Sequence, residues 1–168
     1  PLLTLIVLLG DATKKADEFL KLDKVYEAEI ILGKTSTTGD PEGELTTVSG
    51  LEPSEQDIRD VLEQFMGEIR QRPPIFSAIK INGRRAYDLA RKGEVIEMPE
   101  RQVTIFSLEL LDYTYPNVRI RVHVSSGTYI RTLAEDIGKV LETGAYCSEL
   151  RRTKVAEWSV ADATAIER

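Results

Sequence analysis

An arginine stands where a helix disfavours a positive charge. Residues 119–124 alternate charged or polar with apolar side chains and predict a half-buried strand, which ends where Ser126-Gly127-Thr128 begins a helix. Arg131 falls in the first turn of that helix, and a helix N-terminus already carries partial positive charge that favours anions. This position suggests an anionic partner, a carboxylate or a phosphate, brought from another segment. The alternative, an ordinary surface arginine, stays open on this stretch alone.

Two other residues offer chemistry of a related kind. Asp40 lies in a segment, residues 33–43, that has no hydrophobic period, and it is either a turn residue or a ligand for an arginine. Tyr26 begins a strand and is either an aromatic at the edge of the core or a stacking face for an extruded base. Neither choice is settled by the neighbouring residues.

The other reactive side chains favour structural roles. His123 sits on a strand among alternating apolar residues, which is more typical of a packed or solvated histidine than of a hydrolase base. Cys147 has no base cluster beside it, so we expect it to be buried and inert. With a single cysteine and a single histidine, a zinc site is implausible and an internal disulfide framework is excluded, which fits a reducing, cytoplasmic compartment.

The charge of the chain is unevenly distributed. The net charge of −6 argues weakly against a polyanionic partner, yet residues 69–101 hold eight basic and four acidic side chains. A basic segment on an acidic protein is a plausible footprint for nucleic acid, and it is equally the pattern of a solvated loop. Roughly thirty residues of sparse apolar content also exceed an ordinary connection, which indicates a functional loop.

Hydrophobic periodicity predicts the elements that position these residues. Residues 2–9 are an apolar run too short for a membrane span and without the basic leader of a signal peptide, so they predict a buried strand. The other expected strands cover residues 26–32, 102–111 and 118–124, with short pieces at 144–152 and 154–160, and the expected helices cover residues 11–22, 54–66, 84–92 and 128–141. This mixture, without strict βαβ alternation, predicts an α+β (mixed α/β) fold around a largely antiparallel sheet.

Six ordered blocks resemble one known family, the TruB family of tRNA pseudouridine synthases, and they cover almost the whole chain. The blocks are Leu9-Gly10-Asp11-Ala12-Thr13-Lys14, Lys24-Val25-Tyr26, Gly39-Asp40-Pro41-Glu42-Gly43, the stretch 73–83 followed by Tyr87 and 90–93, Gly127-Thr128-Tyr129-Ile130-Arg131-Thr132-Leu133, and Leu150-Arg151-Arg152-Thr153.

The resemblance implies a pseudouridine-synthase fold, with helices flanking a mixed sheet and substrate RNA in a cleft across it. It implies a reaction without cofactor or metal that breaks the glycosidic bond of the T-loop uridine of tRNA, rotates the base and rejoins it through carbon 5. By the same resemblance, Arg131 pairs with a catalytic aspartate, Tyr26 packs on the flipped base, and Asp40 belongs to the active-site loop.

The resemblance also implies an RNA interface and a division of the chain. Residues 74–97 match an inserted thumb that folds onto the T-arm of tRNA, within a single catalytic domain over residues 1–168. Side chains expected to contact the RNA there are Lys80, Arg84, Arg85, Arg91 and Lys92, and outside the thumb Tyr129, Arg151 and Arg152. We expect the protein to be a monomer and not to bind a membrane.

The chain departs from the family pattern at its N-terminus. The block with the catalytic aspartate is absent, and Pro1-Leu2-Leu3 looks like a shortened remnant of it, so the chain looks truncated there; the C-terminal RNA-binding extension of the family is also missing. The acidic partner of Arg131 is then expected to lie outside the sequence. Two functions follow for comparison: a tRNA pseudouridine-55 synthase, or a catalytically inactive RNA-binding module of the same fold.

Overall fold

A six-stranded sheet forms the centre of the computed structural model, which describes residues 4–75, 77, 80–81, 84–86 and 98–164. The strands follow the order β10-β9-β1-β8-β7-β4, and every neighbouring pair is antiparallel. Their bounds are Lys24–Leu32 (β1), Gly67–Gln71 (β4), Arg101–Thr114 (β7), Asn117–Val124 (β8), Ala145–Val155 (β9) and Trp158–Ser159 (β10). The prediction of an α+β fold with a largely antiparallel sheet is confirmed.

Alternation along β8 gives the sheet one apolar and one charged face. Val118, Ile120, Val122 and Val124 are buried, while Arg121 between them is exposed. Successive side chains of a strand point to opposite faces, so the apolar set packs into the core and the charged set faces away. On the charged face Arg121 donates to Glu27 of β1 and to Glu109 of β7.

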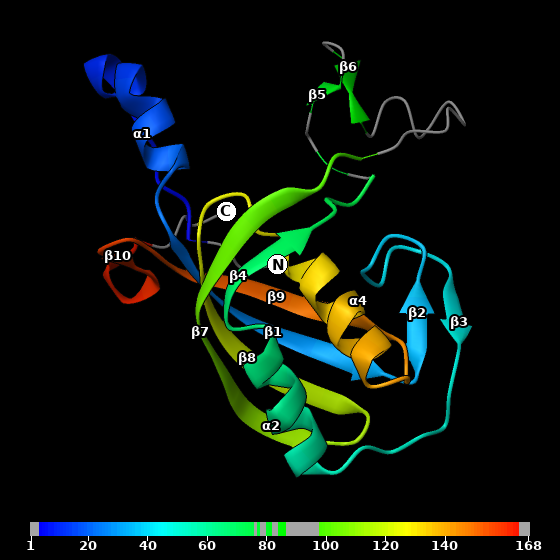
Figure 1. The fold of residues 1–168 in the computed structure, drawn as a ribbon. Helices are drawn as coiled ribbons and strands as arrows, with labels where there is room; N and C mark the ends of the chain where they lie inside the picture. The colour runs from blue at the N-terminus through cyan, green and yellow to red at the C-terminus, as the bar shows by residue number, and fades with distance from the viewer. Residues whose placement is uncertain (1–3, 76, 78–79, 82–83, 87–97, 165–168) are drawn as a thin grey trace.

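Two helices cover the apolar face of the sheet, α2 (Glu55–Gln64) and α4 (Ile130–Val140), as Figure 1 shows. Ser54 begins α2 with a capping box, because its hydroxyl accepts from the Asp57 N–H while the Asp57 carboxylate accepts from the Ser54 N–H. Close packing of α4 on β9 depends on Gly138, since a Cβ there would overlap Ala145.

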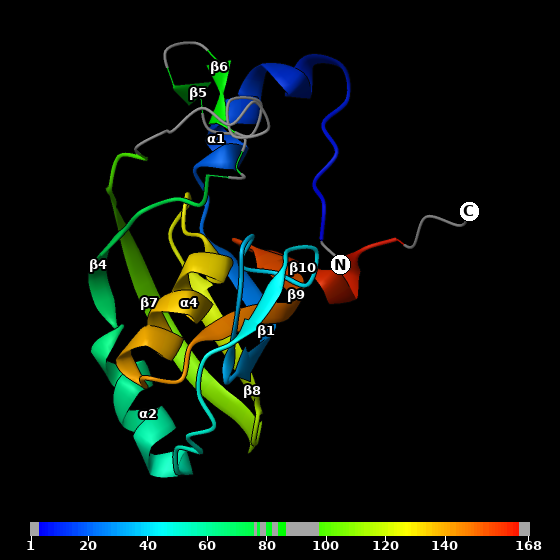
Figure 2. The same cartoon turned by 90° about the vertical axis from the view of Figure 1, so that its right-hand side faces the viewer.

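The N-terminal strand prediction is wrong for residues 4–9. These residues form no regular element, and Leu5 and Leu9 are 71% and 79% exposed. Thr4 alone is held against the sheet, because its backbone N–H and its hydroxyl both donate to the Arg152 carbonyl. The segment then continues as a 3₁₀ turn, η1 (Gly10–Lys15), and a short helix, α1 (Ala16–Leu20), which project away from the sheet (Figures 1 and 2).

The remaining elements refine the sequence predictions. The segment around Asp40 is the connection of a small hairpin, β2 (Lys34–Ser36) with β3 (Leu45–Thr47), and a second hairpin pairs β5 (Lys80–Ile81) with β6 (Arg84–Arg85). Of the helix expected over residues 84–92, Arg84 and Arg85 form strand β6 instead, Ala86 is helical, and the residues from 87 on lie outside the described part. The two pieces expected near the C-terminus are one continuous strand, β9, followed by β10 and the 3₁₀ turn η2 (Val160–Asp162). Among the described residues, no helix combines the length and the apolar character needed to cross a membrane.

Candidate active site

Arg131 meets an acidic partner from a distant part of the chain. Its Nη1 lies 2.6 Å from Asp40 Oδ2 and also donates to the Thr38 carbonyl at 3.3 Å. The pair joins the first turn of α4 to the β2–β3 connection, 91 residues away in the sequence. The expectation of an anionic partner from another segment is thus confirmed by Asp40. Asp40 is a ligand for an arginine and also a turn residue, since the Glu42 N–H donates to its carboxylate. The pairing of Arg131 with the catalytic aspartate of the family stays a prediction.

Local hydrogen bonds hold the loop at residues 36–43, which carries Asp40. The Thr38 hydroxyl donates to Asp40 Oδ1 at 2.6 Å, and the Glu42 N–H donates to the same oxygen at 3.1 Å. The Ser36 hydroxyl donates to the Asp40 carbonyl at 2.5 Å. The Asp40 carboxylate is therefore oriented by hydrogen bonds from its own loop as well as by Arg131.

The electrostatics of the pair differ from those of a surface ion pair. The side chains of Arg131 and Asp40 are 26% and 21% exposed, against 80% and 94% for Lys14 and Asp11. Burial raises the pKa of Asp40, but hydrogen bonds from Thr38, Arg131 and the Glu42 N–H outweigh it, so this pKa lies below its usual value. Asp40 is ionised at neutral pH, in a place where solvent screens its interaction with Arg131 less than at the surface.

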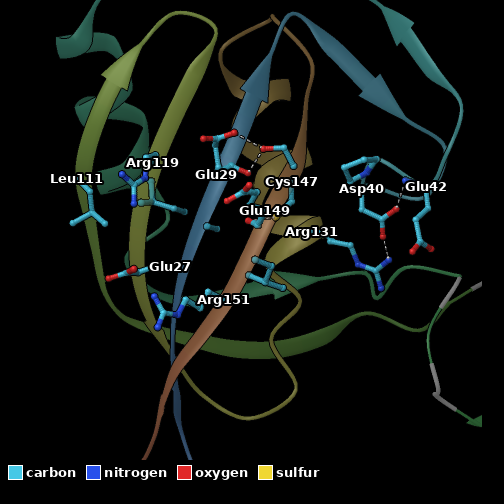
Figure 3. A pocket seen from close by; sticks show the side chains of 15 residues that line it. Glu27, Glu29, Asp40, Glu42, Leu111, Arg119, Arg131, Cys147, Glu149 and Arg151 are labelled. Carbon is cyan, nitrogen blue, oxygen red and sulfur yellow. Dashed lines mark hydrogen bonds and ion pairs between the residues drawn. The ribbon is translucent and has the colours of Figure 1, made fainter. Parts of the chain in front are cut away.

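A pocket of about 740 Å³ opens beside the pair. Figure 3 shows Arg131 and Asp40 pointing toward one another on one side of it, with Glu27, Arg119 and Arg151 on the other. Cys147 lines the pocket between them, but it is 3% exposed, and burial raises the pKa of its thiol to about 12. The prediction of a buried, unreactive cysteine is confirmed, since a thiol with that pKa is protonated at neutral pH.

The other predicted site residues lie around the pocket to different extents. Tyr26 is on β1, partly buried against the core, with Val122 and Arg152 as its Cα partners, and it is not among the residues that line the pocket. Arg151 does line it, whereas the Arg152 side chain donates to the Thr4 carbonyl. Tyr129 is the N-cap residue of α4, and its backbone exchanges two hydrogen bonds with the Gln71 side chain.

The predicted thumb is only partly within the described residues. Lys80 is paired with Arg85 across the β5–β6 hairpin, and Arg84 is exposed. Arg91 and Lys92 lie outside the described residues. In Figures 1 and 2 this hairpin stands off the sheet, away from the core formed with α2 and α4.

Sequence reasoning missed two residues that border the ion pair, Gly39 and Glu135. A Cβ built on Gly39 would lie 2.5 Å from Glu135 Oε1, so the two residues are in close contact. The available signal was the spacing of Arg131 and Glu135, which are four residues apart and share one face of a helix.

The hydrogen bond between His123 and Asp23 was also not predicted from the sequence. His123 lies beside Asp23 and against the ring of Phe106. Among the described residues, no group of three or more His, Cys, Asp or Glu side chains is placed to hold a metal ion.

Solved structures share the fold of this chain. A chain of a Cbf5–Nop10–Gar1 complex superposes with a TM-score of 0.70 at 30% identity, covering 94% of this chain and 38% of that one. A chain of an H/ACA RNP bound to a substrate RNA containing 2′-deoxyuridine gives a TM-score of 0.62 at 27% identity, covering 90% of this chain and 34% of that one. The chain therefore has the pseudouridine-synthase fold predicted from its sequence.

Family models and curated relatives make the assignment more specific. The model of the N-terminal domain of TruB family pseudouridylate synthases matches residues 4–130, and the model of the tRNA pseudouridylate synthase B C-terminal domain matches residues 131–168. The chain belongs to the TruB family. Relatives named tRNA pseudouridine synthase B include one from Pseudomonas fluorescens (strain Pf-5), 48% identical over 94% of this chain and 52% of its own length, and one from Clostridium kluyveri, 42% identical over 96% and 56%. The chain thus spans about half the length of these relatives.

Proposed function

We propose that this chain is the catalytic-domain portion of a tRNA pseudouridine synthase that converts the T-loop uridine at position 55 to pseudouridine. The observation that supports the proposal most directly is the Arg131–Asp40 pair beside a pocket of about 740 Å³, in a chain of the TruB family. The family relation also supports tRNA as the partner, through its T-arm stem-loop, and a monomer working in the cytoplasm without metal or cofactor.

The proposed reaction moves the ribose from one atom of the base to another. The bond between ribose C1′ and uracil N1 breaks, a bond from C1′ to C5 forms, and the hydrogen on C5 leaves for solvent while N1 gains one. Atoms and electrons balance without an added oxidant or reductant. In this scheme Asp40 and the Thr38 carbonyl hold the Arg131 guanidinium in one orientation. The oriented positive charge would stabilise an anionic group in the site. Tyr26 would pack against the extruded base, since aromatic rings stack on any base.

A second candidate function is RNA binding without catalysis. The alternative is a catalytically inactive RNA-binding module of the same fold. Both functions predict binding of the same RNA, so a binding measurement alone does not separate them.

Tritium release separates the two functions. The chain is incubated with a T-arm stem-loop labelled with tritium at uridine C5, and tritium in the solvent is counted against a no-protein control. A synthase releases tritium in proportion to product, and Arg131→Lys is expected to slow release about 100-fold, because a lysine cannot reproduce the fixed fork of the guanidinium. Background release from the parent chain, together with binding of the stem-loop, would favour the inactive module.

A further inference from the structure

Glu135 and Arg131 lie one helical turn apart on α4, and both contact the loop at residues 36–43. Arg131 donates to the loop on both sides of Gly39, at the Thr38 carbonyl and at Asp40 Oδ2. Glu135 Oε1 fills the space between these two contacts, where a side chain at position 39 would begin. The two α4 residues therefore contact three consecutive residues of the loop, with Glu135 at the centre.

The backbone of Gly39 is held on its other sides by hydrogen bonds. Its N–H donates to the Ser36 carbonyl at 3.2 Å, and its carbonyl accepts from the Cys147 N–H at 3.0 Å. Its φ of +74° lies in the left-handed region that an L side chain rarely adopts. Gly39 is thus fixed between β9 and α4, and an L side chain there would have to adopt an unfavourable φ and displace the end of the Glu135 side chain.

The surroundings of Glu135 are unfavourable for a carboxylate. Burial raises its pKa, Asp136 adds to the effect, and Lys139 and Arg131 oppose it. None of the hydrogen bonds among the described residues ends at the Glu135 carboxylate, and a partly buried charge without hydrogen bonds is costly. The Glu135 carboxylate therefore contributes little to the stability of the fold. Its position next to the Arg131–Asp40 pair suggests a role in the site.

The loop separates two cavities. Arg131 and Asp40 line the pocket of about 740 Å³, whereas Glu135 lines a second cavity of about 540 Å³ together with Thr38 and Thr132. Glu135 Oε1 and Arg131 Cβ both face the point where a Cβ of Gly39 would stand, at 2.5 Å and 3.3 Å, so α4 contacts the loop on one side of Gly39. Because Gly39 directly precedes Asp40, a shift of Gly39 toward α4 would move the Asp40 carboxylate relative to Arg131.

We propose that Glu135 is a positioning residue, whose carboxylate supports Gly39 on the side of α4 and so keeps Asp40 within hydrogen-bond distance of Arg131. Only the catalytic consequence rests on the proposed function. The effect on the loop follows from the contacts alone.

The test uses the whole chain, with Glu135→Ala, Glu135→Gln, Gly39→Ala and the double variant Gly39→Ala/Glu135→Ala. Asp136→Asn is the matched control, because it removes a neighbouring acid that lines the same cavity and pairs with Lys139. Hydrogen exchange of the Cys147 amide reports on the loop independently of activity, since that amide donates to the Gly39 carbonyl. Tritium release from the T-arm stem-loop gives kcat and KM.

Glu135→Ala is expected to speed exchange of the Cys147 amide about tenfold and to lower kcat about tenfold with KM within about twofold, because a small displacement of an active-site group costs rate. Glu135→Gln keeps the shape of the side chain and is expected to restore both values, and Asp136→Asn to leave them unchanged. Gly39→Ala is expected to cost less in the Glu135→Ala background than in the parent, since the contact with Glu135 Oε1 is then removed, while the contact with Arg131 Cβ and the positive φ contribute equally in both backgrounds.

Two results would overturn the proposal: unchanged Cys147 exchange in Glu135→Ala, or the same cost of Gly39→Ala in both backgrounds. Faster exchange with unchanged kcat would also contradict it, because Glu135 would then be only structural. If the parent itself releases no tritium, the proposed function fails, while the exchange data and the double-variant comparison still decide the role of Glu135.

Discussion

At the scale of single residues, the Arg131–Asp40 pair shows what a sequence can and cannot say about a site. The cost of a cation in the first turn of a helix pointed to an anionic partner without naming it. Two roles remained open for Asp40, and the expected acid was placed outside the chain. The choice depends on the fold, because the 90 residues between the partners include three strands of the sheet, β4, β7 and β8.

The lowered pKa of Asp40 predicts how this pair affects stability. A carboxyl whose pKa is lower in the folded than in the unfolded state stabilises the fold above its usual value near 3.8, and this contribution is lost as the pH falls through the lowered pKa. Asp40→Asn should therefore destabilise the chain at pH 7 by about 1–3 kcal/mol, with a smaller difference in acid. Urea unfolding at pH 7 and pH 3 measures the effect.

Asp11→Asn is the control for this prediction, because it breaks the exposed pair with Lys14 and should change stability by less than about 0.5 kcal/mol. An equal effect of the two substitutions would mean that the Arg131–Asp40 pair is no better shielded than a surface pair.

At the scale of elements, the sequence was most informative where hydrophobic periodicity is regular. The strand expected over residues 118–124 and the helix expected over residues 54–66 both correspond to observed elements, since each signal is carried by neighbours in the sequence. Residues 4–9 have the composition of a strand but no regular structure. An apolar run forms a buried strand only if the fold provides a partner strand for it. The residues of the run do not show whether such a partner exists.

The β5–β6 hairpin carries the prediction that belongs to this scale. Arg84 and Arg85 lie on β6, in the basic segment at residues 69–101. If they contact phosphates, Arg84→Ala combined with Arg85→Ala should weaken binding of the T-arm stem-loop and reduce the slope of log K against log salt by about 1.4–1.8, because each contact contributes about 0.7–0.9. Binding titrations at several salt concentrations give the slope.

Arg59→Ala serves as the control for the hairpin, since Arg59 lies on α2 and pairs with Glu55. Its slope should equal that of the parent. An unchanged slope in the double variant would remove the hairpin from the RNA interface, and equal losses in both variants would indicate a general effect of net charge.

At the scale of the whole molecule, the boundary between the two matched family models, at residues 130 and 131, falls inside α4. The core does not divide there. Ile120 on β8 and Ile137 on α4 belong to one buried cluster, and both are 0% exposed. Residues matched by the two models are thus packed against each other, which predicts one cooperative folding unit.

Cooperativity can be tested from both sides of that boundary. Ile120→Ala and Ile137→Ala should each lower the free energy of unfolding by about 2–5 kcal/mol, since each leaves a cavity in the shared core. Val140→Ala, on the exposed side of α4, should cost less than about 1 kcal/mol. Two probes should be compared within each variant: the fluorescence of Trp158, which lies on β10 at the edge of the sheet, and far-UV circular dichroism. In any one variant both probes should give the same urea midpoint. Midpoints that separate in Ile137→Ala but not in Ile120→Ala would mean that the part containing α4 and β9 unfolds on its own, and that the family boundary is also a physical one.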